Sequence, residues 1–319
     1  MTRSTPPPPS PSSDRTGLLF AAGSAALFSL KGVAVKLGLQ HGLNVEQMMT
    51  WRMTLALPVF LAVGITAAKK RNAFPTTRVL FTAAGLGVLS YYVCTWLDFS
   101  GLRHLSAQFE RMILFTYPTL TAVLAWVLLG ERFTRRHAVS LVVSYAGILL
   151  MFGFEAQSLG TNVARGATLV FSAALLFALY VVLAKATITT LGSKLFTCIA
   201  MTAATLAIIT HQLVTQASGT APNVAFFSTP AIAIGLFMAV VCTVLPSFML
   251  SEALARIGPA RASATGSIGP VVTTVAAVVV LGEPFGLPQA GGLALILLGV
   301  GMLTRAKTDA KPKEKGDSK

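Results

Sequence analysis

Two stretches of the sequence carry the same pattern: YPTLTAVLAWVLLGERF at Tyr117–Phe133 and GPVVTTVAAVVVLGEPF at Gly269–Phe285. In each, a proline near the start is followed by an apolar run that closes on Leu-Gly-Glu, and the copies stand 152 positions apart. The similarity extends outward, since LFSLKGVAVK and LFALYVVLAK match at an offset of 149. The chain is therefore predicted to contain two homologous halves, at residues 17–154 and 166–304.

The composition places both halves in a membrane. Of the 319 residues, 54% are apolar and only 11% are charged, and the mean hydropathy is +0.72. A soluble protein carries about 25% charged residues, and a spanning helix needs about 20 mainly apolar ones. We therefore predict an all-α integral membrane protein of ten transmembrane helices. The ten spans are 17–39, 45–67, 79–100, 105–129, 138–154, 166–188, 193–216, 230–252, 257–281 and 287–304.

The segments outside these spans are short or polar. Residues 1–16 are rich in proline and serine, which predicts a disordered tail rather than a cleaved signal peptide. Residues 305–319 form a basic tail. The cysteines Cys94, Cys198 and Cys242 fall within spans and are interpreted as buried apolar thiols. We expect no disulfide, no metal site and no cofactor.

The lysines and arginines set the orientation, because cytoplasmic loops of membrane proteins are enriched in them. With the N-terminus inside, the inner segments carry 18 of the 25, and the outer loops carry only Arg103 and Arg165. The net charge of +14 thus comes from loops and tails, and we expect no nucleic-acid partner. We predict a multi-pass protein of the cell membrane, the bacterial inner membrane, with both termini cytoplasmic.

Five spans in each half is an odd number, so the second half is predicted to lie upside down relative to the first. Inverted repeats of this sort are typical of secondary transporters, whose substrate sites lie near the bilayer midplane between the repeats. The sequence resembles the paired EamA-type domains of the drug/metabolite transporter superfamily over about residues 17–304. Arg52 and the run SAQFERMILFTYPT at Ser106–Thr119 strengthen the resemblance. It implies ten helices, cytoplasmic termini and export or exchange of small metabolites.

Ionisable side chains within spans are costly and are taken as candidates for a functional site. With a rise of about 1.5 Å per residue, Lys31, Arg52, Glu110 and Arg111 all lie about 8–12 Å below the outer face. Asp98 lies near the same level. We predict a substrate-binding site there for an anionic group, because Arg binds both oxygens of a carboxylate. Glu110 either holds these cations in place or carries a coupling proton.

Two further residues are candidates for substrate binding. Tyr117 follows Glu110 by two turns on a similar face, and Ser267 lies in a stretch of small residues opposite it. Structural interpretations stay open: Glu110, Arg111 and Arg52 as an ion-pair network, and the small residues as helix-packing contacts. Asp98 is alternatively paired with Arg103 at the surface. Lys36 and Lys185 are alternatively directed to the membrane interface. Structural roles are the alternative for Glu131, Glu283 and His211.

We predict a secondary transporter, an exporter or exchanger that moves a small polar metabolite by alternating access, with proton coupling left open. Its partners are then a small-molecule substrate and the lipid bilayer, and a monomer and a homodimer both stay open. A lipid or polyprenol-carrier flippase and an integral membrane enzyme are the alternatives. The sequence has no catalytic motif such as H-E-x-x-H, G-x-S-x-G or a P-loop, so the protein is not expected to be an enzyme.

Overall fold

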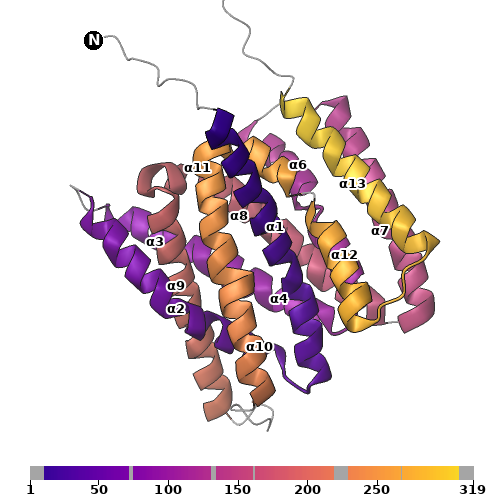
Figure 1. Ribbon diagram of the computed structural model, residues 1–319, viewed down its shortest axis with the longest axis horizontal. Coiled ribbons are helices and arrows are strands. Elements are labelled where there is room, and N and C mark those ends of the chain that lie inside the picture. Colours follow the sequence, from indigo (N-terminus) through magenta and orange to yellow (C-terminus); the bar gives the residue numbers. More distant parts are fainter. Residues whose placement is uncertain are drawn as a thin grey trace, which may run out of the picture.

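Figure 1 shows the chain, in a computed structural model, as a bundle of long helices. The structure describes residues 11–71, 75–130, 134–160, 162–218, 229–266 and 268–308. Within these ranges every regular element is helical, as predicted. The elements are α1 (Pro11–Gln40), α2 (Val45–Lys69), α3 (Thr77–Gly87), η1 (Val88–Val93), α4 (Cys94–Leu102), α5 (Ala107–Leu114), α6 (Tyr117–Leu129), α7 (Arg135–Leu159), α8 (Asn162–Leu191), α9 (Ser193–Ala217), α10 (Thr229–Ala239), η2 (Val240–Val244), α11 (Leu245–Thr265), α12 (Ile268–Leu281) and α13 (Leu287–Thr308).

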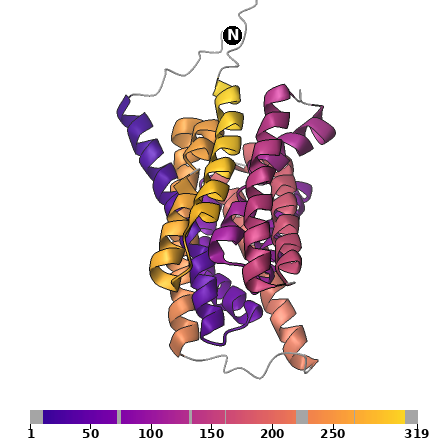
Figure 2. The same cartoon turned by 90° about the vertical axis from the view of Figure 1, so that its right-hand side faces the viewer.

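Many of these elements are long enough to cross a bilayer. In the described part of the chain, eight helices are sufficiently long and apolar, and Ile268–Leu281 and Leu287–Met302 are apolar but shorter. Figures 1 and 2 place the start of α1 and the end of α13 at the same end of the bundle. The described chain thus returns to the side on which it begins. Of the predicted tails, residues 11–16 belong to α1 and residues 305–308 to α13, so the helices extend further than predicted; the rest of both tails lies outside the described residues.

The repeated Leu-Gly-Glu sequence ends a helix in each half. Gly130 and Gly282 each adopt a left-handed backbone with φ of 67°, one position after α6 and α12 respectively. Glycine is favoured there because it has no Cβ to clash. At the second copy, the N–H of Glu283 donates to the carbonyl of Ala277 at 3.2 Å, so the chain that follows the glycine satisfies a free carbonyl in the last turns of α12. The glycine therefore explains why this part of the repeat is kept in both halves.

Two of the predicted spans are broken. The span predicted at 105–129 is divided into α5 and α6 at Phe115–Thr116, and Pro118 lies in the first turn of α6, where proline is tolerated. The predicted boundary between 252 and 257 is wrong, because α11 continues to Thr265. Its packing along α1 outweighs the local tendency of Gly258-Pro259 to end a helix. The break lies instead between α11 and α12.

A pair of π-helical turns also follows the repeat. η1 begins at Val88 within the α3–α4 span, and η2 begins at Val240 between α10 and α11. The two starting positions differ by the same offset of 152 that relates the Leu-Gly-Glu sequences. π-Helical turns inserted into α-helices occur frequently at functional sites. Both halves therefore share a local irregularity as well as a sequence pattern.

Helices α7 and α13 form a tight antiparallel crossing at one side of the bundle (Figure 1). The Ser140 hydroxyl donates to the carbonyl of Gly299 at 2.6 Å. At the other end of the crossing, a Cβ on Gly147 would lie 2.8 Å from the carbonyl oxygen of Gly292. Ser140 and Gly292 are equivalent positions of the two halves at the offset of 152, and so are Gly147 and Gly299. The two contacts are therefore equivalent under the repeat.

We expect Gly147→Leu to destabilise the protein by about 1–3 kcal/mol, because the new side chain would overlap the backbone of α13. Gly153→Leu is the matched control on the same helix, since a Cβ there meets nothing within 4 Å. Chemical unfolding of the two purified variants measures the difference. Equal stability of the two would contradict the close crossing.

Candidate functional site

The predicted cation Lys31 is paired with an acid. Its Nζ lies 2.6 Å from Oδ2 of Asp98, which joins α1 to α4. Asp98 is only 2% exposed, and Lys31 is largely buried. The alternative that Asp98 pairs with Arg103 at the surface is therefore wrong. A buried pair of this kind is strongly destabilised when one partner is removed, because the other charge is left without compensation.

Glu110 on α5 extends this pair. It is 1% exposed, and a Cβ on Gly32 of α1 would lie 2.9 Å from its Oε2, so the glycine makes room for the carboxyl group. The carboxyl groups of Glu110 and Asp98 lie within hydrogen-bonding contact of each other. Such a contact is favourable only when one proton lies between the two groups, because two carboxylates repel.

Arg111 is next to Glu110 but points toward a different neighbour. Its Nη2 donates to the hydroxyl of Ser29 on α1 at 3.1 Å. A Cβ on Gly269 of α12 would lie 2.8 Å from the same nitrogen, so the guanidinium fits against the second half. Nε of Arg111 has no hydrogen-bond partner among the described residues. Arg111 thus lies where the two homologous halves meet.

Arg52 on α2 is a buried cation with no acidic side chain at ion-pair distance among the described residues. It is 5% exposed, and it forms no ion pair with any residue that the structure describes. Its guanidinium lies over the ring of Phe99 at 5.6 Å, and Lys31 lies over the same ring at 5.5 Å. The remaining contact is a weak one to the sulfur of Met53 at 3.7 Å, and Nε has no partner. Burying such a group costs several kcal/mol unless an anion compensates it.

We refer to Lys31, Arg52, Asp98, Glu110 and Arg111 together as the ion cluster. The structure brings these five predicted residues close together through α1, α2, α4 and α5. The ring of Tyr117 packs edge-on against Phe177 at 5.1 Å, and Tyr117 also interacts electrostatically with Arg111 of the cluster. Ser267 lies outside the described residues. The roles of all these residues in substrate binding stay predictions.

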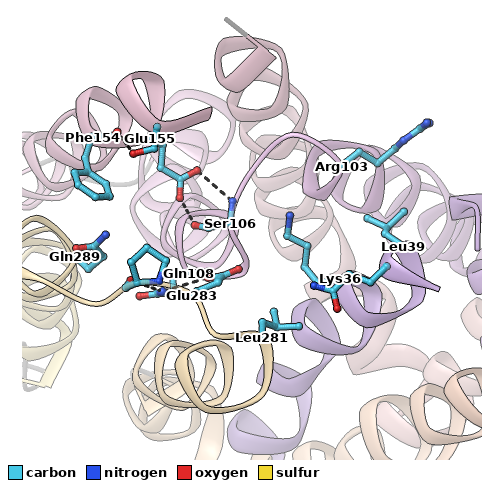
Figure 3. A pocket seen from close by; sticks show the side chains of 13 residues that line it. Lys36, Leu39, Arg103, Ser106, Gln108, Phe154, Glu155, Leu281, Glu283 and Gln289 are labelled. Carbon is cyan, nitrogen blue, oxygen red and sulfur yellow. Dashed lines mark hydrogen bonds between the residues drawn. The ribbon is translucent and has the colours of Figure 1, made fainter. Parts of the chain in front are cut away.

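A cavity of about 420 Å³ opens at the end of the bundle opposite the termini. We call it the vestibule. Figure 3 shows its lining from the end of α1, the start of α5, the end of α7 and the α12–α13 connection. The lining residues are Lys36, Leu39, Gln40, Arg103, Ser106, Gln108, Phe154, Glu155, Ser158, Leu281, Glu283, Pro284 and Gln289. Gln108 and Glu110 are two positions apart on α5, so the vestibule lies next to the ion cluster.

Two carboxylates at the vestibule hold the first turn of α5. Glu283 accepts from the backbone N–H of Ala107 at 2.7 Å and from that of Gln108 at 3.3 Å. Glu155 accepts from the N–H of Ser106 at 3.1 Å and from its hydroxyl. Negative charge is favourable at a helix N-terminus, where the backbone N–H groups lack partners within the helix. We call this arrangement the carboxylate clasp.

The clasp was only partly predictable. Glu283 was expected to be structural because of its place in the repeat, and its bonds to α5 agree with that interpretation. Glu155 was not identified, because it lies 49 positions from Ser106 and belongs to no recognisable motif. The one available signal was Ser106, whose hydroxyl accepts from the N–H of Phe109 at 3.0 Å as an N-cap does.

Comparison with known proteins matches both halves to one family. The profile of the EamA-like transporter family matches residues 15–153 and 164–305. The uncharacterized transporter YcbK of Bacillus subtilis is 29% identical over 294 residues, which cover 89% of this chain and 92% of that protein. The uncharacterized transporter YyaM of the same organism is 27% identical over 256 residues, which cover 78% and 81% of the two chains. A solved crystal structure with 18% identity has a TM-score of 0.63 and covers 92% of this chain and 97% of its own.

Proposed function

We infer the function from one premise: the chain belongs to the EamA-like transporter family and is a multi-pass membrane transporter. On this premise we propose a secondary transporter that exports or exchanges a small polar organic metabolite by alternating access. The relatives named above are called transporters, and their names give no substrate. The substrate class is therefore argued from the side chains of this chain alone.

The observation that carries the proposal is the buried guanidinium of Arg52, which forms no ion pair with the described residues. The ion cluster holds three cations, Lys31, Arg52 and Arg111, against Asp98 and Glu110. Because Asp98 already pairs with Lys31, the positive excess lies on the two arginines. An anionic substrate would supply the missing charge, and the planar fork of Arg suits a carboxylate. We therefore propose that the substrate carries a carboxylate or another anionic group.

We further propose that the chain crosses the membrane ten times, as two inverted five-helix repeats. The repeated Leu-Gly-Glu turns, the π-helical turns at the same offset and the exchanged contacts between α7 and α13 support this arrangement. The broken spans α5–α6 and α11–α12 carry residues that meet at the interface of the repeats. Interrupted helices at such an interface are typical of transporters that alternate between two openings.

The bundle end that holds the termini is proposed to be cytoplasmic, in the bacterial inner membrane. Single cysteines test this orientation. Ser218→Cys, after α9, is expected to react with a membrane-impermeant reagent added outside intact cells, whereas Thr77→Cys, at the start of α3, is expected to be protected. Both positions are exposed in the bundle, so burial does not explain a difference. Labelling of Thr77→Cys alone would reverse the proposed orientation.

Proton coupling is proposed to involve the contact between Glu110 and Asp98. One proton held between these carboxyl groups would be released when they are separated, either by an arriving cation or by the change between the two open states of the transporter. The coupling role is then distinct from anion binding at Arg52. If this role is right, uptake by the wild type depends on a pH gradient. Uptake by Glu110→Gln does not.

The experiment that tests the function is uptake by proteoliposomes from a pool of labelled small organic acids and amines. We expect saturable accumulation of at least one anionic solute, recovered chemically unchanged, and no accumulation with Arg52→Met. Recovery of a converted product would instead support the alternative of an integral membrane enzyme. Movement of labelled lipid in the same vesicles, without solute uptake, would support the flippase.

A further inference from the structure

The vestibule contains polar groups that the ion cluster does not use. Its volume of about 420 Å³ is within the range of small-molecule sites. One part of its wall is apolar and comes from Leu39, Phe154 and Leu281. The other part is polar, and Figure 3 shows Lys36 facing the carboxylate clasp across the cavity. Two of its polar side chains, Lys36 and Gln108, have groups that could bind a ligand.

Lys36 is the positive group of the vestibule; the carboxylates of Glu283 and Glu155 act on it through space but do not contact it. It is half-buried, and its amine forms no hydrogen bond or ion pair with the described residues. Figure 3 shows this amine pointing into the cavity, whereas the guanidinium of Arg103 points away from it. Lys36 is therefore the cation that an anion in the vestibule would meet.

Gln108 supplies the available acceptor. It is 2% exposed, and its amide nitrogen donates to Glu283 and to the carbonyl of Pro284, each at 3.2 Å. Its Oε1 has no hydrogen-bond partner among the described residues. An unpaired buried acceptor costs about 1–3 kcal/mol, so a donor from a ligand would be favourable there.

The two carboxylates of the clasp give the side of the vestibule near Gln108 a negative charge. The oxygens of Glu155 and Glu283 accept hydrogen bonds from the start of α5, so they are occupied in this structure. Their two charges exceed the partial positive charge of one helix N-terminus, which is about half an elementary charge. A cationic donor beside Gln108 would therefore be attracted, while an anionic group would be held at the opposite wall.

We propose that the vestibule is a second solute-binding site, separate from the ion cluster, for a dipolar solute with a small apolar body. Lys36 binds the anionic end, Oε1 of Gln108 accepts from an ammonium or other donor, and Leu39, Phe154 and Leu281 contact the apolar part. As a place where solute binds before or after crossing the ion cluster, the site rests on the proposed transport function. Binding itself does not require transport.

Three probes of matched shape test the site: leucine, 4-methylpentanoate, which lacks the ammonium, and 3-methylbutylamine, which lacks the carboxylate. A ligand that binds the folded protein raises its unfolding midpoint, so titration of the purified protein in nanodiscs gives an apparent affinity. We expect leucine to bind most tightly. Lys36→Met is expected to weaken leucine binding at least about tenfold, and Lys36→Arg to retain it. Arg78→Met, at an exposed arginine on α3 that does not line the vestibule, is the matched control.

The variant Arg52→Met separates this site from the proposed function. It leaves the vestibule intact, so leucine should stabilise it as it does the wild type, even where uptake is lost. Absence of any leucine effect on the wild type would overturn the vestibule site. So would equal binding by Lys36→Met, or binding of 4-methylpentanoate as tight as that of leucine. A loss of leucine binding in Arg52→Met would assign the ligand to the ion cluster instead.

Discussion

Arg52→Met is expected to abolish transport while leaving the empty protein as stable as the wild type or more stable. The wild type buries a guanidinium that forms no ion pair with the described residues and lies over the ring of Phe99. Replacement of buried charged groups by apolar side chains of similar size is often neutral or stabilising by about 1–4 kcal/mol. Methionine has a similar length and a flexible side chain that fits irregular space. If the guanidinium of Arg52 lowers the stability of the empty protein, we expect it to serve a function, and the function we propose is binding of the substrate.

The measurement pairs uptake by proteoliposomes with chemical unfolding of the same preparations. We expect uptake to fall at least about 100-fold, which corresponds to about 2.7 kcal/mol of lost interaction with the substrate. Arg78→Met is the matched control, since Arg78 is exposed on α3 and lies far from the ion cluster in the sequence and along the bundle. Normal uptake by Arg52→Met would eliminate the anionic site. A large loss of stability would show that the guanidinium is structural.

Depth along the helices was predictable from the sequence, and rotation about their axes was not. The rise per residue placed Lys31, Arg52, Glu110 and Arg111 at one level, and the structure brings them together with Asp98. Which cation pairs with Asp98 depends on how α1, α2 and α4 turn their faces. Those rotations are set by packing between distant segments. The sequence alone therefore does not show whether Lys31 or Arg52 pairs with Asp98.

The irregular features show the same limit. The glycine of each Leu-Gly-Glu sequence marked a helix end because only a local backbone preference is involved. The π-helical turns at Val88 and Val240 have no comparable signal, although their equal placement follows the repeat. The continuation of α11 to Thr265 arises from contact with α1, which a local reading of Gly258-Pro259 does not include.

Lys31→Ala is expected to behave in the opposite way to Arg52→Met and to destabilise the protein by about 3–5 kcal/mol. Removing Lys31 leaves the carboxylate of Asp98 buried, with the carboxyl group of Glu110 in contact and its 2.6 Å partner gone. The same reasoning predicts rescue: Lys31→Ala combined with Asp98→Asn removes both charges and should recover much of the lost stability. A double-mutant cycle measured by chemical unfolding gives the coupling energy of the pair. If Lys31→Ala unfolds like the wild type, or if Asp98→Asn gives no rescue, the pair does not stabilise the bundle. The positive charge of Lys31 would then be as available to a substrate as that of Arg52.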